Sequence, residues 1–562
     1  MTKYFVALLV MFFVAWPTFA ADPNGYNALY ECRAGGPQCN VDVVGYVTAS
    51  CAQTITTADS AGTINTKLNT GSSPICIENG DYTGKGIFTL TTSGTSGASR
   101  VLRYTRSSDN DDDPWNQSSA NQAKLKSLDI NASYWIIHRL TFPSIDVAFN
   151  GIARVDIGDF GFANNIISRV LIEGHTNGFS NLSDGMSIGG DNTTVQNSVV
   201  RNSWNFVGAE PMGISCGNGT DVHIVNNEIY DWSAHPIQCG QNNAPTMGGL
   251  VVENNDVYLT PAWYTGDGRT RAKSNLAIKS RGTSTNPIRI IHNRVWGSRV
   301  FDASLSGIVA GAGASFIING PIPGGLSYIL VQNNIIFDAQ EGIEVVNGDD
   351  TNISFIGNLL YQIKKYYAGQ FWSHAFAPES ATASEIYLNS IIEAEVFTIS
   401  GISGNMDIRC NAIIQSGAPE TGPGGSGNIA DFNVFYGSTL FTYGGTDTNI
   451  NKTVTIHSKS KAYSIGDLMV PASLNNYMYR AVAAGITSNS STTPCTVLGC
   501  TFTDGSVTWQ AIRGPYTFYR KLLTSPESYT IPYARAHAST PEINACPSNY
   551  AARSGIGINN SN

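Results

Sequence analysis

Lys279 and Arg281 are the two residues whose types and spacing best fit catalytic chemistry. They lie two positions apart in segment 275–281, where Leu276 and Ile278 alternate with Asn275, Ala277 and Lys279. Successive side chains of a strand point to opposite faces, so we expect both cations to face outward. Neighbouring cations lower the pKa of a lysine so that it can act as a base, and an arginine can bind a carboxylate with two hydrogen bonds. Such a pair could remove the proton beside a uronate carboxylate, the first step of β-elimination.

Residues around this pair extend the candidate site. Segment 261–299 is rich in cations, including Arg269, Lys273 and Arg294, and such a local patch suits an acidic polymer in a chain of net charge −9. His235 is a candidate acid or base, although a lone histidine at a turn is more often structural. The candidate substrate-binding residues are Gln238, Asn242, Arg299, Trp263, Tyr264, Arg271 and Glu344.

Glycines are expected to surround Lys279. Six strand-like segments precede successive copies of a repeat described below, namely 185–189, 213–217, 236–240, 275–279, 307–311 and 342–346. The fifth position of these segments is Gly, Gly, Gly, Lys, Gly and Val. This alignment predicts that Lys279 lies on a glycine-lined surface able to hold a polymer, provided that the register is correct.

Calcium is a possible cofactor, and no other is indicated. Asp184, Asp191 and Glu210 lie near the same segments and could supply oxygen ligands. The ten cysteines lack the spacing of a zinc site.

A short repeat indicates the elements that must position these residues. From about residue 190 a phrase of apolar residues around an asparagine recurs nine times, with its central asparagine at positions 197, 227, 255, 293, 334, 358, 389, 411 and 433. The irregular period with a base near 22 residues predicts a parallel β-helix, in which each coil has three short strands and variable turns. Asparagine tolerates left-handed backbone, and its amide can bond the next coil, so the repeat predicts a ladder of stacked asparagines.

Composition agrees with a strand-rich exported protein. Charged residues make up 13% and glycines number 57, which disfavours helices, while 42% hydrophobic residues allow a large core. The net charge of −9 excludes broad electrostatic binding of nucleic acid. Ten cysteines predict disulfides without fixing their pairing; Cys216 and Cys239 share one inward slot, either as a small-residue stack or as a disulfide.

Four segments are predicted along the chain. Residues 1–20 read as a signal peptide, with Lys3, an apolar run and Thr18-Phe19-Ala20 before the cleavage point, so we expect a secreted or periplasmic protein without a membrane span. Residues 21–450 form the β-helix, 451–515 a small β module and 516–562 a C-terminal tail. Tyr463, Tyr477, Tyr479 and Trp509 either stack on sugars or form the core of the module.

The asparagine repeat and its flanking strands resemble secreted right-handed parallel β-helix proteins, above all polysaccharide lyases, over about residues 40–445. The small module resembles accessory modules of extracellular carbohydrate-active proteins and phage tail proteins. The resemblance implies a lyase with a Lys or Arg base, often assisted by calcium, and an acidic polysaccharide as substrate. A glycoside hydrolase, a uronate C5-epimerase and a non-catalytic carbohydrate-binding solenoid remain open, because one fold hosts many functions.

Overall fold

The computed structural model describes most of the chain from residue 49 to residue 536. The described residues are 49–105, 122–144, 153–158, 161–174, 184–203, 212–217, 219–232, 234–240, 246–260, 274–298, 314–319, 325–346, 350–365, 373–378, 381–387, 389–398, 405–409, 411–414, 416, 429–431, 433–436, 452–471, 477–490, 492–513, 516–523 and 529–536. The predicted signal peptide therefore lies outside the described residues. Within them, no helix has both the length and the apolarity needed to cross a membrane.

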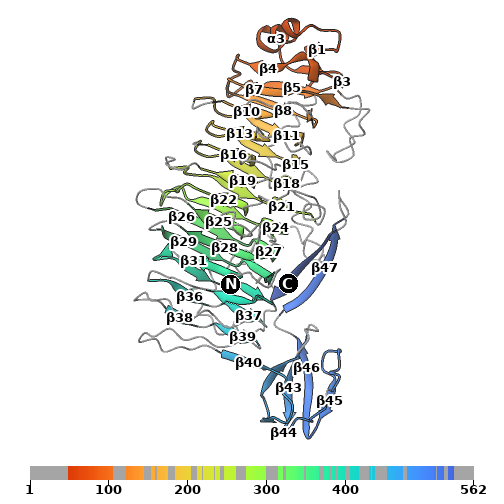
Figure 1. Cartoon of the computed structure of the whole chain (residues 1–562), viewed down its shortest axis with the longest axis vertical. Coiled ribbons are helices and arrows are strands. Elements are labelled where there is room, and N and C mark those ends of the chain that lie inside the picture. Colours follow the sequence, from red (N-terminus) through yellow and green to blue (C-terminus); the bar gives the residue numbers. More distant parts are fainter. Residues whose placement is uncertain are drawn as a thin grey trace, which may run out of the picture.

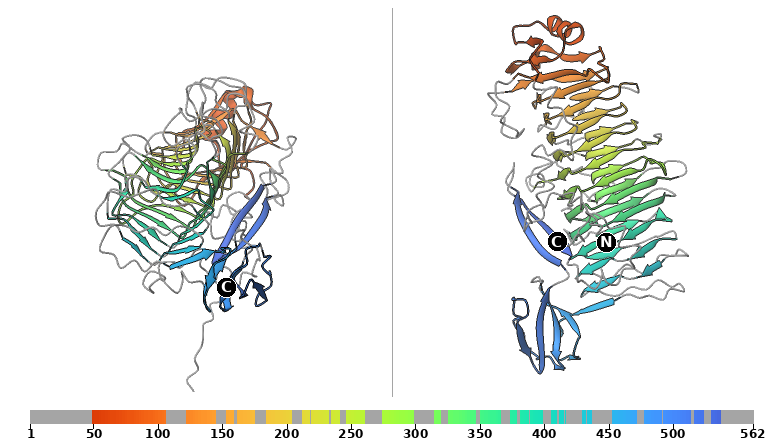
Figure 2. Two further views of the ribbon diagram at one scale, coloured as in Figure 1. Left: turned by 60° about the horizontal axis from the view of Figure 1, so that its bottom comes forward. Right: turned by 180° about the vertical axis from the view of Figure 1, so that it is seen from behind.

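The chain is a right-handed parallel β-helix, as its repeat predicts (Figure 1). Each coil adds one strand to each of three sheets, here named A, B and C, and every strand pairs in parallel with its counterpart one coil away. Figure 2 shows the coils stacked along one long axis.

Sheet A contains β1 (Gln53–Ile55), β2 (Ile75–Ile77), β5 (Arg100–Tyr104), β8 (Trp135–His138), β11 (Ile166–Ser168), β14 (Thr194–Gln196), β17 (His223–Val225), β20 (Val251–Glu253), β23 (Ile288–Ile291), β26 (Ser327–Gln332), β29 (Asp350–Ile356), β33 (Glu385–Tyr387), β36 (Asp407–Arg409) and β38 (Ile429–Asp431), with β32 (Ala381–Thr382) beside β29. Sheet B contains β3 (Gly80–Asp81), β6 (Ala123–Lys124), β9 (Thr141–Phe142), β12 (Leu171–Glu173), β15 (Val199–Ser203), β18 (Glu228–Trp232), β21 (Asp256–Tyr258), β24 (Arg294–Trp296), β27 (Ile335–Ala339), β30 (Leu359–Ile363), β34 (Ser390–Ile392), β37 (Ala412–Ile414), β39 (Val434–Tyr436) and β40 (Lys452–Ile456). Sheet C contains β4 (Ile87–Leu90), β7 (Ser127–Ile130), β10 (Val155–Ile157), β13 (Met186–Ile188), β16 (Met212–Cys216), β19 (His235–Cys239), β22 (Ser274–Ile278), β25 (Ala314–Asn319), β28 (Glu341–Val346), β31 (His374–Pro378) and β35 (Val396–Thr398).

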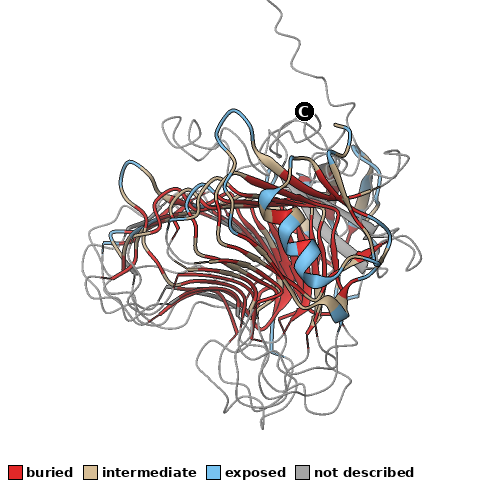
Figure 3. Cartoon of the chain, turned by 90° about the horizontal axis from the view of Figure 1, so that it is seen from above, coloured by how far each residue is buried: buried red, intermediate tan, exposed pale blue. Residues whose placement is uncertain are grey.

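The hydrophobic core fills the inside of the coil. Alternate residues of each strand point inward, and in sheet A they form a column of Ile and Val that includes Val195, Ile224 and Val252, all 0% exposed. Figure 3 shows the buried strands enclosing this core when the solenoid is viewed along its axis. Helix α3 (Ala61–Thr70) covers one end, with Ile64 and Leu68 in the core, and a 3-10 helix, η1 (Thr83–Lys85), follows.

The asparagine ladder is present between sheets A and B. The backbone N–H and Nδ2 of Asn255 both donate to Oδ1 of Asn293, at 3.0 Å each, and Asn293 donates to Asn334 in the same way. Nδ2 of Asn293 also donates to the carbonyl of Val252, at 2.8 Å. The members are Asn227, Asn255, Asn293, Asn334, Asn358, Asn389, Asn411 and Asn433, each at most 2% exposed.

Two details of the predicted ladder are wrong. Asn197 is not a member, because Ser198 takes its place in the ladder. Oγ of Ser198 accepts from the N–H of Val170, and its own N–H donates to Oδ1 of Asn227. Where the preceding residue is described, the left-handed backbone belongs to the residue before the ladder position, as at Asn226, Asn254 and Asn333, with φ of 61°, 55° and 56°. The ladder asparagines are therefore selected for their buried amides rather than for their backbone conformation.

The register of one predicted segment is also wrong. Residues 307–311 were expected to follow 275–279, but β25 occupies that place, with Leu276 opposite Phe316 and Ile278 opposite Ile318. Segment 307–311 lies outside the described residues. The five segments at 185–189, 213–217, 236–240, 275–279 and 342–346 do share one register once β25 is inserted.

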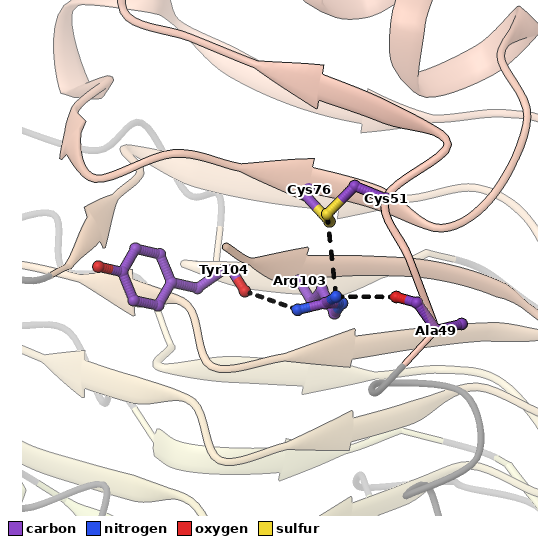
Figure 4. The surroundings of a disulfide bond; sticks show 5 residues. All are labelled: Ala49, Cys51, Cys76, Arg103 and Tyr104. Atoms are coloured by element: carbon purple, nitrogen blue, oxygen red, sulfur yellow. Dashed lines mark hydrogen bonds between the residues drawn. A yellow bond between two sulfur atoms is a disulfide. The ribbon is translucent and has the colours of Figure 1, made fainter. Parts of the chain in front are cut away.

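Three disulfides lie in the described part of the chain: Cys51–Cys76, Cys216–Cys239 and Cys495–Cys500. Cys216 and Cys239 are opposite one another in adjacent inward positions of sheet C, which resolves the two alternatives in favour of a disulfide. Around the first disulfide, Arg103 donates to the carbonyls of Ala49 and Tyr104 (Figure 4). This bridge ties the chain entering the solenoid to its second sheet A strand.

The C-terminal module is a small antiparallel unit continuous with sheet B. Its strands are β41 (Ala462–Tyr463), β42 (Leu468–Val470), β43 (Tyr477–Ala483), β44 (Gly485–Ile486), β45 (Thr501–Asp504) and β46 (Val507–Arg513). The long strand β40 joins the two units, because it pairs with β39 and then with β42.

Three of the four candidate stacking aromatics form the core of the module, and the fourth, Tyr477, packs against that core and is partly buried. Tyr463, Tyr479 and Trp509 are 5%, 0% and 0% exposed and pack together with Met469. For these three rings, the prediction that they form the core of the module is therefore correct. Buried in this way, they are unavailable for stacking on sugars.

Two strands are described within segment 516–562, the predicted C-terminal tail. They form the antiparallel hairpin β47 (Tyr516–Leu523) and β48 (Tyr529–Ala536). β48 contacts β30, so the hairpin lies against sheet B of the solenoid (Figures 1 and 2).

Replacing a central ladder residue should destabilise the solenoid. Asn293→Ala removes the acceptor of the N–H and Nδ2 of Asn255 and one of the two donors to Oδ1 of Asn334, all in a fully buried site, so we expect a loss of about 2–4 kcal/mol. The exposed helix substitution Asn65→Ala is the control and should change stability little. Urea-induced unfolding followed by circular dichroism measures both, and equal midpoints for the two variants would contradict the role of the ladder.

Candidate functional site

Lys279 lies at the outer end of β22 on sheet C. The preceding residue Ile278 points into the core and is fully buried, whereas Lys279 is partly exposed. Its backbone N–H donates to the carbonyl of Cys239 at 2.7 Å, which fixes this end of the strand to the coil below. Ser280 is buried again and Arg281 is partly exposed, so both cations face outward with one inward residue between them.

The glycines beside Lys279 have a packing reason. Extending the strand register places Gly240, Gly217 and Gly189 in line with Lys279 on the preceding coils. A Cβ on Gly240, where φ is +89°, would lie 2.5 Å from the carbonyl carbon of Lys279, and one on Gly189 would lie 2.9 Å from the carbonyl oxygen of Gly158. On the other side the line continues with Asn319 and Val346 rather than with glycine.

A second outward column runs along the middle of sheet C. Gln238, Ala277, Ile317 and Glu344 follow one another in register, and all are at most 7% exposed. Gln238 lies ~8 Å and Glu344 ~12 Å from Lys279, judged from strand spacings. Oε1 of Gln238 is a buried acceptor without a hydrogen-bond partner in the structure.

His235 does not join Lys279. It begins β19, and Lys279 follows the end of β22, so the two are ~17 Å apart along neighbouring strands. Nδ1 of His235 lies 2.9 Å from Oγ and 3.1 Å from the carbonyl of Ser274, and the ring is only 3% exposed. His235 and Lys279 therefore cannot act on one substrate atom.

Arg294 does not contribute to the predicted cationic patch. It lies on the outer face of sheet B, 1% exposed, and donates through Nε and Nη2 to the carboxylate of Asp256. Six of the predicted site residues lie outside the described residues: Asn242, Arg299, Trp263, Tyr264, Arg271 and Glu210. The same holds for Arg269 and Lys273.

The described residues do not fit a calcium site. Asp184 precedes β13 and Asp191 follows it, ~16 Å or more apart by strand spacing. Asp191 accepts hydrogen bonds from the N–H and Oγ1 of Thr220, as a turn residue does. Within the described part of the chain, no three His, Cys, Asp or Glu side chains are grouped to hold a metal ion.

The sequence reasoning missed a group of carboxyls on sheet C. Asp129 and Asp156 are opposite one another on β7 and β10, in the outward column that later contains Gln238. Asp184 accepts hydrogen bonds from the N–H of Met212, at 2.8 Å, and from Ser215. The alternation in Leu128-Asp129-Ile130 and Val155-Asp156-Ile157 was the available signal, because each aspartate lies between two inward residues.

Burial and charge perturb these carboxyls. Burial raises the pKa of Asp184 to about 6, with a contribution from the negative charge of Asp156, while the two hydrogen bonds oppose the shift. Burial also raises the pKa of Asp129, although Nδ2 of Asn131 donates to it at 2.9 Å. A carboxyl with a raised pKa beside a second carboxyl can donate a proton while its neighbour stays ionised.

The outer face of sheet B carries a second polar network. Arg201 donates to Oε1 of Glu173 at 2.6 Å and to the hydroxyl of Tyr230 at 3.1 Å. The hydroxyl of Tyr258 donates to Glu228 at 2.6 Å. Stacked rings continue the row from Tyr230 through Tyr258 and Trp296 to Phe337. Because these polar groups are paired with one another, we assign them to stability.

Similarity to known proteins is found in the fold and not in the sequence. No protein-family model matches the chain, and no curated protein sequence matches it. The PL6-family alginate lyase AlyGC is 13% identical, with a TM-score of 0.47, over 73% of this chain and 54% of that one. The chain therefore spans only about half the length of that lyase.

Two further structural neighbours act on other polysaccharides. The pectate lyase Pel9A is 13% identical, with a TM-score of 0.39, over 65% of this chain and 80% of that one. The catalytic domain of a GH87 α-1,3-glucanase is 13% identical, with a TM-score of 0.44, over 74% of this chain and 70% of that one. The neighbours thus include lyases and a glycoside hydrolase, and at these identities they carry no information on the mechanism of this chain.

Asp184→Asn should stabilise the protein at neutral and alkaline pH. The unfolded carboxyl ionises near pH 4 and the folded one near pH 6, so wild-type stability falls as the pH rises through this window. We expect a gain of about 1–2 kcal/mol at pH 8 after allowance for partial exposure, and almost none below pH 4. Thermal melts of both proteins across this range measure the difference. A gain that is equal at pH 4 and pH 8 would contradict the raised pKa.

Proposed function

We propose that the chain is a secreted lyase that cleaves a uronate-containing acidic polysaccharide by β-elimination. The observation that carries the proposal is the outward placement of Lys279 and Arg281 at one edge of sheet C, with inward residues on either side of Lys279. Three disulfides support export to an oxidising compartment.

Lys279 acts as the base in this proposal. Its neutral amine takes the proton from the carbon beside the uronate carboxylate, a carbon–carbon double bond forms as the bond to the leaving oxygen breaks, and that oxygen takes up a proton from water. Arg281 binds the carboxylate with two hydrogen bonds and offsets the negative charge that develops during proton removal. The free Oε1 of Gln238 accepts a hydrogen bond from a sugar hydroxyl, which would satisfy its buried lone pairs.

Lys279→Ala should reduce elimination at least ~100-fold, the usual scale for loss of a general base, without lowering stability. Ultraviolet absorbance of the unsaturated uronate product measures the rate on a panel of acidic polysaccharides. Lys279→Arg keeps the charge but gives up its proton far less readily than lysine, so it should also eliminate more slowly than the wild type. The exposed Lys365→Ala is the matched control and should turn over normally. Unchanged turnover in Lys279→Ala would overturn the assignment.

A glycoside hydrolase is the second candidate, favoured by Asp184 and Asp156. Glycosidases use two carboxyls, one protonated as the acid and one ionised as base or nucleophile, and the raised pKa of Asp184, to which the charge of Asp156 contributes, suits this division. In this case neutral or acidic polysaccharides would give new reducing ends without ultraviolet absorbance. Asp184→Asn would abolish that activity and Lys279→Ala would not, so the two variants separate the candidates. If neither signal arises on any polymer, an epimerase or a non-catalytic binder gains support.

A further inference from the structure

The exposed apolar side chains of the described residues are concentrated in the small module. Six large apolar side chains are exposed among the described residues. Five of them belong to the module and one to the solenoid. Three of these are Ile465, Val482 and Ile486, exposed by 71%, 39% and 56%. Scattered single residues of this kind are ordinary, but a concentration on one small unit marks an interaction surface.

Backbone pairing brings these three residues to one end of the module, here called the apolar tip. The N–H of Gly466, next to Ile465, donates to the carbonyl of Ala481, next to Val482, at 2.8 Å. Ile486 lies on β44. Its backbone N–H donates to Oγ of Ser506, in the turn between β45 and β46, at 2.8 Å. β44 is at the end of the module away from the solenoid (Figure 1).

Exposed cations surround the apolar tip. Lys461 precedes Ala462, which pairs with Ile486. The carbonyl of Lys461 accepts a hydrogen bond from the N–H of Thr487 at 3.0 Å. Lys459 lies two residues earlier, and Arg480 precedes Val482 by two on the same outward face of β43. All three side chains are exposed. The one exposed acidic group nearby is Asp467, because Asp504 is buried and bonded to His457.

The charge of the chain is divided in the same way. Residues 452–536 contain eight Lys and Arg against three Asp and Glu, a net charge of +5, whereas residues 1–451 contain 24 against 38, a net charge of −14. An acidic solenoid is repelled by an anionic surface, so the basic C-terminal part determines which end approaches it. Aliphatic side chains flanked by lysines and arginines are the combination that enters the headgroup region of anionic lipids.

We propose that the apolar tip binds a bilayer surface with anionic lipid headgroups and so holds the solenoid next to a membrane. Ile465, Val482 and Ile486 insert among the headgroups, and Lys459, Lys461 and Arg480 bind their phosphates. An acidic glycan is the less favoured ligand, because Tyr463, Tyr479 and Trp509 are in the core of the module and its exposed large apolar residues are aliphatic.

Flotation of the full-length protein with lipid vesicles tests the proposal. The wild type should float with phosphatidylcholine vesicles that contain phosphatidylglycerol, much less with phosphatidylcholine alone, and less at high salt. Lys459→Glu/Lys461→Glu/Arg480→Glu should partition at least about tenfold more weakly, and Ile465→Ser/Val482→Ser/Ile486→Ser should also lose binding. Because all six side chains are exposed, circular dichroism and melting temperature should be unchanged.

A charge-matched variant provides the control. Arg289→Glu/Lys364→Glu/Lys365→Glu alters the net charge equally, but its three exposed residues lie on the solenoid, so it should still float. Wild-type protein that does not float with anionic vesicles would overturn the proposal, as would equal loss in the control. Retention of an acidic polysaccharide that the tip variants abolish, without vesicle binding by the wild type, would also overturn it and assign the tip to a glycan.

Discussion

The buried asparagine ladder is the constraint on which the rest of the solenoid depends. Each ladder residue between the two ends accepts two hydrogen bonds from one neighbour through Oδ1, while its N–H and Nδ2 donate to the next. An amide in a water-free site must find these partners, so a coil that slipped by one residue would leave several buried polar groups unsatisfied. The ladder therefore fixes the level at which each coil enters sheet B, and the strand pairings extend that register to sheet C.

Fixed register allows insertions without loss of the core. Successive ladder positions are 22 to 41 residues apart, yet their side chains meet at the same distance each time. The variation is taken up between strands, for example between β21 and β22. Inward positions stay apolar in every coil, so chemical variety is confined to the outer faces.

The two outer faces with buried charges differ in how those charges are satisfied. On sheet B, Arg294 binds Asp256 and Arg201 binds Glu173, so each cation has an anion one coil away. On sheet C, Asp129 and Asp156 are opposite one another in one outward column, whereas Asp184 lies before β13 and outside that column; burial raises the pKa of Asp129 and of Asp184. Paired charges serve stability, whereas carboxyls with perturbed protonation are suited to moving a proton.

The sequence by itself determined the fold and much of the ladder, because both rest on local alternation and on a repeated buried amide. It also determined that Lys279 and Arg281 flank an inward residue, since the side-chain period of a strand is two. It did not determine that β25 lies at 314–319 rather than at 307–311, or that Ser198 begins the ladder in place of Asn197. Coils of unequal length leave the choice of neighbour to backbone pairing across the whole stack. Only that tertiary stacking separated His235 from Lys279, placed Asp156 opposite Asp129, paired Arg294 with Asp256 and placed the C-terminal hairpin on sheet B.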